Sequence, residues 1–328
     1  QAGKTTRASD QLIQKAKRLS QEMSRVGRSL STSVTLPLAS AAAGAIKLAT
    51  DFDSALTQIN TLVGVSRDEV AGFRQEILNL SGAVGRGPTE LARGLFAVTS
   101  AGQRGTAALQ TLEAASKASA VGLGATRDVA LASVAAVTAY GESNLSASES
   151  VEILVGTVEQ GNLAAEELSG VIGRVIGIAA ELGVAFEDVG GFIASFSRLG
   201  VSAAESTTAL RGILNSILKP TEDTKKAFEN LNMSVSGFQD QIQEQGFTVA
   251  MQNLVNRSRE MDVSLGRVFP SVEGLAGVLG VFGGEAGKAE EVLDGVSAAV
   301  GTLEDRFQAV IDQDPAMAFN LMRAEIES

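Results

Sequence analysis

Between residues 163 and 219 the apolar residues recur at helical spacing in three successive segments. Each segment carries an acid near its start, and the segments end at Gly183, at Gly200 and before Pro220. Acids suit the first turn of a helix because its free N–H groups and the helix dipole favour negative charge. A glycine just beyond the last turn adopts the left-handed conformation that ends a helix at little steric cost. The pattern therefore predicts three consecutive short helices.

The same signals of helix start and helix end occur through much of the chain. Ser-x-x-Glu segments that fit the capping box begin at Ser66, Ser146 and Ser202. The glycines that fit helix ends are Gly102, Gly122 or Gly124, Gly141, Gly161, Gly183 and Gly200. Helices of about 15 residues in a repeat of about 20, joined by short connections, fold back on their neighbours. We therefore expect an all-α fold, built as a stack of short antiparallel helices.

Residues 1–33 are predicted to form a separate basic amphipathic arm. Its apolar residues follow the a and d positions of a heptad over about two and a half repeats. A short coiled coil and an amphipathic helix lying on the body of its own chain both fit this pattern. The residues expected to mediate self-association are Leu12, Leu19, Met23, Val26 and Leu30. The bases expected to contact acidic partners are Lys15, Lys17, Arg18, Arg25 and Arg28.

The remainder divides at Pro220 into a helical core, residues 34–220, and a second helical region, residues 221–328, which we expect to continue in a longer polypeptide. Residues 38–50 form an Ala-rich run that Lys47 interrupts, so we expect a buried helix rather than a membrane span. Residues 232–237 are predicted to be a loop with a brief extended stretch.

Two groups of spaced glycines predict close approach of helices. Gly173 and Gly177 fit a small-x-x-x-small pattern, which in this setting indicates a close helix contact. Gly274, Gly277 and Gly280 recur at every third residue, and each costs helix stability relative to alanine, roughly 1 kcal/mol. We expect this second stripe to pack against a neighbour, although a flexible segment would also fit it.

Composition argues against catalysis. The chain has neither His nor Cys, which excludes disulfides, Cys- or His-ligated zinc sites and Ser-His-Asp triads. The acidic pairs lie at predicted helix starts, where capping explains them: Glu166/Glu167, Glu187/Asp188 and Glu222/Asp223. The net charge is −11 and the first 30 residues carry seven bases against two acids, so the body is strongly acidic. An acidic body disfavours nucleic-acid binding. We expect no enzyme activity, no cofactor and no specific nucleic-acid partner.

An ordered set of short segments carries a resemblance to a known family. The segments are Pro88–Ala92, Thr99–Gly102, Thr126–Val129, Ala180–Gly183, Phe186–Val189, Arg198–Val201 and Thr208–Leu214. Together they resemble the core region of phage tail tape measure proteins, over roughly residues 45–220. No single segment is diagnostic, but their order is.

The resemblance implies a structural virion protein that lies in the tail tube lumen or at the tip, helps set tail length and leaves before DNA passes. A ruler needs a continuous helix, which gives about 1.5 Å per residue. A segment with repeated helix ends is instead predicted to be a globular part that docks the ruler on tail tube and tip proteins. We also expect a homo-oligomer and transient contact with the host membrane. The alternatives are a helical-repeat adaptor that binds a peptide, or a membrane-active helical protein, neither with a role in tail length.

Overall fold

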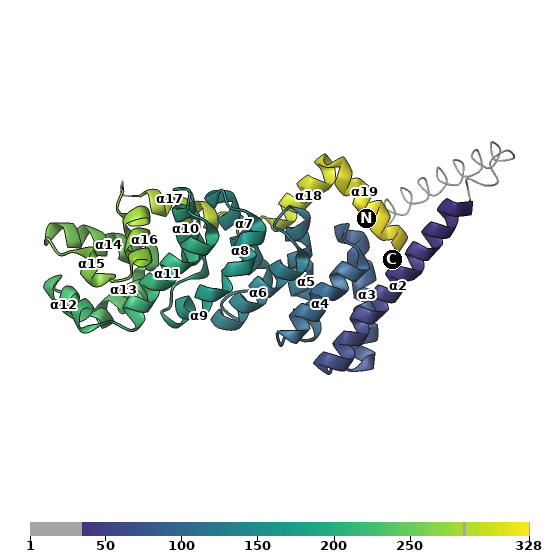
Figure 1. The fold of residues 1–328 in the computed structure, drawn as a ribbon, viewed down its shortest axis with the longest axis horizontal. Helices are drawn as coiled ribbons and strands as arrows, with labels where there is room; N and C mark the ends of the chain where they lie inside the picture. The colour runs from purple at the N-terminus through teal and green to yellow at the C-terminus, as the bar shows by residue number, and fades with distance from the viewer. Residues whose placement is uncertain (1–34, 285–286, 328) are drawn as a thin grey trace. The chain divides into compact units, whose positions relative to one another are not determined.

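The structure is a computed structural model that describes residues 35–284 and 287–327. These residues form eighteen helices and no strand, which confirms the all-α class (Figure 1). Contacts divide the chain into two units, residues 1–53 and residues 54–328. Helix α2 (Thr35–Val63) provides the described residues of the first unit and the first residues of the second. Pro37 lies in the first turn of α2, where a missing N–H does no harm.

The second unit begins with a row of helices in chain order. They are α3 (Arg67–Val84), α4 (Pro88–Ser100), α5 (Gly105–Ala120), α6 (Thr126–Tyr140), α7 (Ala147–Gly161), α8 (Ala165–Val171), α9 (Gly173–Glu181), α10 (Phe186–Ser197) and α11 (Ala203–Leu218). Neighbours in the sequence pack together, as α4 does with α5, and so do helices two apart, such as α4 with α6 and α5 with α7. Each helix therefore buries its apolar side between two or more others.

Four short helices follow Pro220, and four more complete the chain. The first four are α12 (Glu222–Asn230), α13 (Val235–Gln245), α14 (Phe247–Glu260) and α15 (Leu265–Val268). The last four are α16 (Val272–Phe282), α17 (Lys288–Ser297), α18 (Leu303–Gln313) and α19 (Pro315–Glu327). Phe269 and Pro270 separate α15 from α16, and Asp314 precedes α19.

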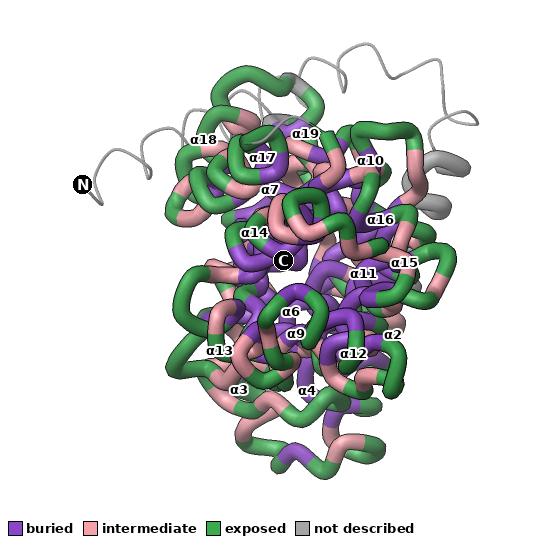
Figure 2. The backbone as a smooth tube through the Cα atoms, turned by 90° about the vertical axis from the view of Figure 1, so that its left-hand side faces the viewer, coloured by how far each residue is buried: buried purple, intermediate pink, exposed green. Residues whose placement is uncertain are grey.

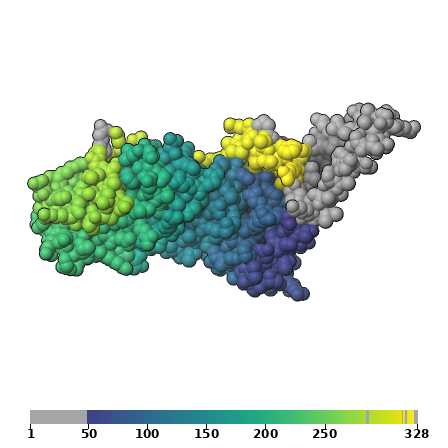
Figure 3. Space-filling model, in the orientation of Figure 1, coloured from purple at the N-terminus to yellow at the C-terminus, as the bar shows by residue number. Residues whose placement is uncertain are grey.

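The last four helices return along the row in reverse order. Helix α16 packs on α11 and α10, α17 on α10 and α7, α18 on α5, and α19 on α3. In the space-filling view the yellow C-terminal residues accordingly lie against the blue residues that begin the row (Figure 3). Nothing in the sequence pattern predicted this return.

Local signals set most helix boundaries as expected. Gly102, Gly141 and Gly183 have positive φ just beyond their helices. Helix α7 is the exception, because Gly161 is its last helical residue and the left-handed residue just beyond it is Asn162, with φ 56°. Gly161 instead allows close packing, since a Cβ there would lie 2.8 Å from the Cα of Ala194.

Two of the three predicted capping boxes form completely, at Ser146 and Ser202. At the third, the Ser66 hydroxyl accepts from the Glu69 N–H, but the Glu69 carboxylate does not return to Ser66. It accepts instead from the N–H of Gly105, at 3.2 Å, at the start of α5. A carboxylate on one helix can thus supply the cap of another.

Two expectations about local structure were wrong in part. The predicted single helix ending at Gly183 is divided at Ile172 into α8 and α9, where the Val175 N–H turns back to the Ile172 carbonyl at 3.1 Å. The loop predicted over residues 232–237 is shorter than expected, because α13 starts at Val235; Ser234, whose hydroxyl caps the helix, has an extended backbone.

The two glycine stripes behave differently. A Cβ added at Gly274, Gly277 or Gly280 would lie 3.2 Å or closer to atoms of neighbouring helices, so the expected close packing of this stripe is confirmed. A Cβ at Gly173 or Gly177 would meet nothing within 4 Å, so the expected helix contact there was wrong.

The core is continuous across residue 220. The Phe282 ring of α16 contacts both Phe192 of α10, at a centroid distance of 6.2 Å, and Phe247 of α14, edge to face at 6.1 Å. Figure 2 shows buried positions where helices face one another and exposed positions on their outer sides. Helices that follow Pro220 are therefore part of the same apolar core as α10.

Candidate functional site

The site with the most specific polar geometry lies where α18 meets α5 and α7. Helix α18 receives no side-chain cap from its own N-cap residue, Thr302. The Glu152 carboxylate of α7 provides one, accepting from the N–H of Gly301 at 2.9 Å and of Leu303 at 3.2 Å. Glu152 is only 7% exposed. A buried carboxylate at a helix start gains from the unpaired N–H groups and from the helix dipole.

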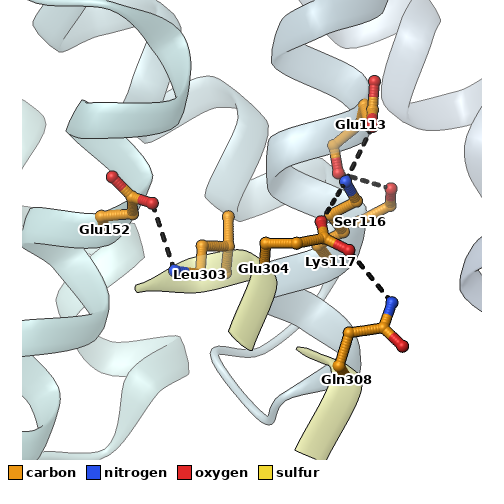
Figure 4. Close-up of polar contacts among 7 residues, drawn as sticks. All are labelled: Glu113, Ser116, Lys117, Glu152, Leu303, Glu304 and Gln308. Carbon is orange, nitrogen blue, oxygen red and sulfur yellow. Dashed lines mark hydrogen bonds and ion pairs between the residues drawn. The ribbon is translucent and has the colours of Figure 1, made fainter. Parts of the chain in front are cut away.

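A lysine beside this cap joins α18 to α5. The Lys117 ammonium donates to Glu113 at 2.8 Å and to Glu304 at 2.7 Å (Figure 4). Burial alone would lower the pKa of Lys117, but its hydrogen bonds to the two carboxylates outweigh this and raise the pKa. The hydrogen bond from Lys117, aided by one from Gln308, lowers the pKa of Glu304. We call Glu152, Lys117 and Glu304 the α18 latch.

The latch residues line a surface pocket of about 340 Å³ between α5, α7 and α18. Each carboxylate in it already accepts a hydrogen bond, Glu152 from the backbone, Glu113 and Glu304 from Lys117. A further ion pair joins α18 to α7, where Arg306 donates to Glu159 at 2.8 Å. In the described part of the chain no group of three or more acidic residues is placed to hold a metal ion. The polar groups of this pocket therefore hold α18 against α5 and α7.

A second buried carboxylate acts in the same way at α14. Asp188, 4% exposed, accepts from the N–H groups of Phe247 at 3.0 Å and Thr248 at 3.1 Å and from the Thr248 hydroxyl at 2.6 Å. The N-cap residue of α14 is Gly246, which has no side chain to offer. Glu167 similarly accepts from the Ala204 N–H, at 3.3 Å, at the start of α11.

The acidic pairs therefore lie in first helical turns, as predicted, but Glu167 and Asp188 also cap other helices. Glu187, next to Asp188, is half-buried, and burial raises its pKa, with Glu149 and Asp188 adding to the effect. Glu222 lies at the surface, where a hydrogen bond from Lys225 at 2.7 Å lowers its pKa. Sequence reasoning missed the distant role of these acids. One sequence signal could have indicated it: a predicted helix start whose N-cap residue has no side chain that can cap, as at Gly246.

The preceding helix, α17, is held by different means. It lies against α7 and α10 at positions where these helices carry glycine. A Cβ at Gly156 would lie 2.8 Å from the Val296 carbonyl oxygen, one at Gly190 would lie 3.3 Å from the Val296 side chain, and one at Gly191 would lie 3.2 Å from Leu293. Close approach, rather than charge, fixes α17.

The residues predicted for self-association and for contacts with acidic partners all lie outside the described residues. They are Leu12, Leu19, Met23, Val26 and Leu30, and Lys15, Lys17, Arg18, Arg25 and Arg28. Their roles stay predictions. No helix within residues 35–284 and 287–327 is both long and apolar enough to cross a bilayer.

Comparison with known proteins gives the family. Residues 74–267, more than half of the chain, match the family described as phage-related minor tail protein. The chain belongs to this family. It is also similar to the tape measure protein of Pneumococcus phage Dp-1, with 21% identity over 209 residues, which are 64% of this chain and 18% of that protein. No solved structure matches the chain.

These matches confirm the resemblance to tape measure proteins and give the chain a structural role in a phage tail, as a component of the virion. The chain spans less than a fifth of the length of the Dp-1 protein that it matches. The family match covers α4 to α14, and so includes Asp188 and Glu152 but ends before the latch residue Glu304.

Proposed function

We propose that the second unit is the globular, docking part of a tape measure protein of a phage or phage-like particle. In this proposal it helps set tail length by fixing the ruler to tail tube and tip proteins, and it is released before DNA passes. Its role is structural rather than catalytic. It acts in the tail tube lumen or at the tip, as a homo-oligomer joined through residues 1–33, and it contacts the host membrane only transiently.

The observation that carries this proposal is the shortness of the helices. The longest in the row, α3, has 18 residues, so it spans about 27 Å at 1.5 Å per residue. A continuous helix over the same row and its return would instead be several hundred ångströms long. Because the last four helices retrace the row, the second unit covers still less distance per residue.

The length of the Dp-1 relative supports placing the ruler elsewhere. The match occupies 18% of that tape measure protein, so most of its length lies outside the part that resembles this chain. In this proposal the ruler that measures tail length lies in the remaining part, and the docking unit is the part that resembles this chain.

Tail length in the particle that encodes this chain tests the proposal. A helical segment of about 60 residues, inserted at the exposed turn of residues 142–144, would lengthen the tail by about 90 Å if this region were part of the ruler. We expect unchanged length in electron micrographs. Uniform lengthening in proportion to the insert would contradict the proposal.

Removal of residues 67–313 sharpens the same test. Loss of docking predicts fewer tails or a broad distribution of lengths. A ruler segment predicts tails of one new length, shorter by about 370 Å. Tails of normal number and normal length would contradict a docking role.

A further inference from the structure

Helix α16 is apolar on all sides, although one side faces solvent. Glu273 is the only charged residue among its eleven. Gly274, Gly277, Val278, Val281 and Phe282 form the buried side, against α10 and α11. A helix at the surface of a folded unit normally carries polar residues on its outer side, and a helix that is apolar all round is normally buried. The outer side of α16 therefore lacks a partner in the structure.

The exposed apolar residues of α16 and the half-buried Leu275 form one stripe. Val272 is 79% exposed and Leu279 is 51% exposed, and Leu275 and Ala276 lie between them. These positions are spaced by three and four residues, so they share one side of the helix. This spacing matches a second helix packed along the stripe, in the manner of a helix in an apolar groove.

Leu199 extends the stripe from the end of α10. It is 59% exposed, and its Cδ1 would lie 3.0 Å from a Cβ at Gly280 of α16. Beside it lies a pocket of about 210 Å³, lined by apolar residues that include Val281 and Val292. Of the seven large apolar side chains exposed in the described residues, three are thus gathered here. We call Val272, Leu275, Ala276, Leu279 and Leu199 the α16 face. Clustered exposed apolar residues of this kind mark interaction sites.

The charges around the α16 face are mainly positive. Arg198 and Lys288 line the pocket, and the Arg259 guanidinium donates to the Gly283 carbonyl at 2.5 Å. These contacts place three bases beside the face, Arg198, Arg259 and Lys288, against two acids, Glu291 in the pocket and Glu273 on α16 itself. The whole chain has the opposite balance, with 27 bases and 38 acids. A basic rim selects an acidic partner, because complementary charge speeds association and excludes like-charged surfaces.

We propose that the α16 face binds an amphipathic helix of another tail protein, whose apolar stripe is flanked by acids. The apolar stripe supplies affinity and the rim selects the sign of the partner's charge. A second copy of this chain meeting face to face would bring the bases of one rim against those of the other, so it is the disfavoured occupant. The proposal rests on the docking role proposed above and gives that role a surface and a partner class.

A binding measurement with the 328-residue chain tests this surface directly. The probe is a synthetic helix of about 20 residues with Leu at the a and d positions, Glu at the flanking e and g positions and Ala elsewhere, labelled for fluorescence anisotropy. A second probe carries Lys in place of Glu. We expect saturable binding of the Glu helix, at least about tenfold weaker binding of the Lys helix, and weaker binding of the Glu helix at high salt.

Paired variants locate the binding. In V272S/L279S we expect binding of the Glu helix to fall by at least about tenfold. The matched control is F319S/M322S on α19, where the two side chains are 59% and 45% exposed. Helix α19 packs on α3 and α18, whereas α16 packs on α10, α11, α14 and α17. We expect the control to bind as the unaltered chain does, and circular dichroism to show all three chains equally helical.

Three results would overturn the proposal. They are no saturable binding of the Glu helix, equal binding of the Lys helix, and equal loss of binding in both variants. A dimer that light scattering detects in the unaltered chain, and that V272S/L279S removes, would assign the face to a second copy instead. Failure here leaves the tail-length test untouched, since that test measures whether the unit is a ruler and not which face it binds with.

Discussion

The two halves of the returning segment are held on the row by different forces. Helices α16 and α17 lie against α10, α11 and α7 at glycines, where backbones approach too closely for any larger residue. Helices α18 and α19 lie on α5 and α3, and α18 depends on the latch of Glu152, Lys117 and Glu304. Close apolar packing is insensitive to salt and proton concentration, whereas exposed ion pairs are not.

This difference indicates where the second unit can open. The segment up to α17 is part of the core that Phe192, Phe247 and Phe282 join. In α18 only Leu303 and Phe307 are buried, so its apolar contribution is small beside that of its polar contacts. We therefore expect α18 and α19 to separate from the row at a lower free energy than α16 and α17 do.

The largest expected effect comes from filling the space at α17. In Gly190→Ala a Cβ would lie 2.3 Å from the Thr157 Oγ1 and 3.3 Å from Val296. We expect the free energy of unfolding to fall by about 3 kcal/mol, because α7, α10 and α17 must move apart. Urea denaturation of the purified chain measures this change.

Thr157 provides a matched rescue for that variant. Its hydroxyl donates only to the Ile153 carbonyl within α7, so Thr157→Ala alone has a small expected cost. The double variant should regain a large part of the lost stability, since the closest obstacle is gone. A Gly190→Ala chain as stable as the unaltered one would show that α17 is held loosely.

The next effect concerns the cap of α18. Glu152→Ala leaves the N–H groups of Gly301 and Leu303 without their acceptor, at a cost of about 2 kcal/mol. We expect hydrogen exchange of the α18 and α19 amides to become faster by more than tenfold, while the α16 and α17 amides keep their protection.

The control for Glu152 is Glu159→Ala on the same helix, which removes the surface ion pair with Arg306 at 2.8 Å. It should change exchange in α18 only slightly, because exposed pairs contribute little. Equal acceleration in α16 and α18 after Glu152→Ala would mean that the two halves open together, and the comparison would fail.

The sequence predicted the parts of the fold that short segments encode. The caps at Ser146 and Ser202 and the helix end at Gly183 are fixed by residues within one turn, so they could be read directly. The return of α16 to α19 could not, because it depends on apolar surfaces that meet only after the row has formed. The same holds for Glu152, whose partners lie 149 and 151 residues away.

The two glycine stripes show how a pattern can be right in one place and wrong in another. Apart from Glu273, the α16 stripe has only apolar neighbours within its helix, and other helices cover it. The α9 stripe at Gly173 and Gly177 shares its exposed side with Arg174 and Glu181, and those charges keep it in solvent. Small residues show where a helix can approach, and the residues beside them decide whether it does.

This contrast predicts a smaller effect of opposite sign. In Gly177→Ala the added Cβ meets nothing within 4 Å. We expect stability to rise by about 0.7 kcal/mol, since alanine restricts the unfolded chain and favours the helix. Urea denaturation of Gly177→Ala and of Gly190→Ala makes the comparison. The same added methyl group should stabilise the chain at the open position and destabilise it at the closely packed one. A loss of stability in Gly177→Ala would reveal a contact on α9 that the structure does not contain.

The smallest effect is the pH dependence of the Lys117–Glu304 pair. Since Lys117 lowers the pKa of Glu304 in the folded chain, the pair stabilises α18 at neutral pH, and this contribution is lost as pH falls from 4.5 through the folded pKa. The raised pKa of Lys117 means that its contribution is lost only as pH rises above 10.5. The side chain of Glu304 is 57% exposed, so the contribution is screened to about 0.3 kcal/mol.

Hydrogen exchange of α18 should therefore differ between the unaltered chain and Glu304→Gln at pH 7, and the difference should disappear at acid pH. A difference that persists there would mean that Glu304 acts through its shape or its bond to Gln308, and not through its charge.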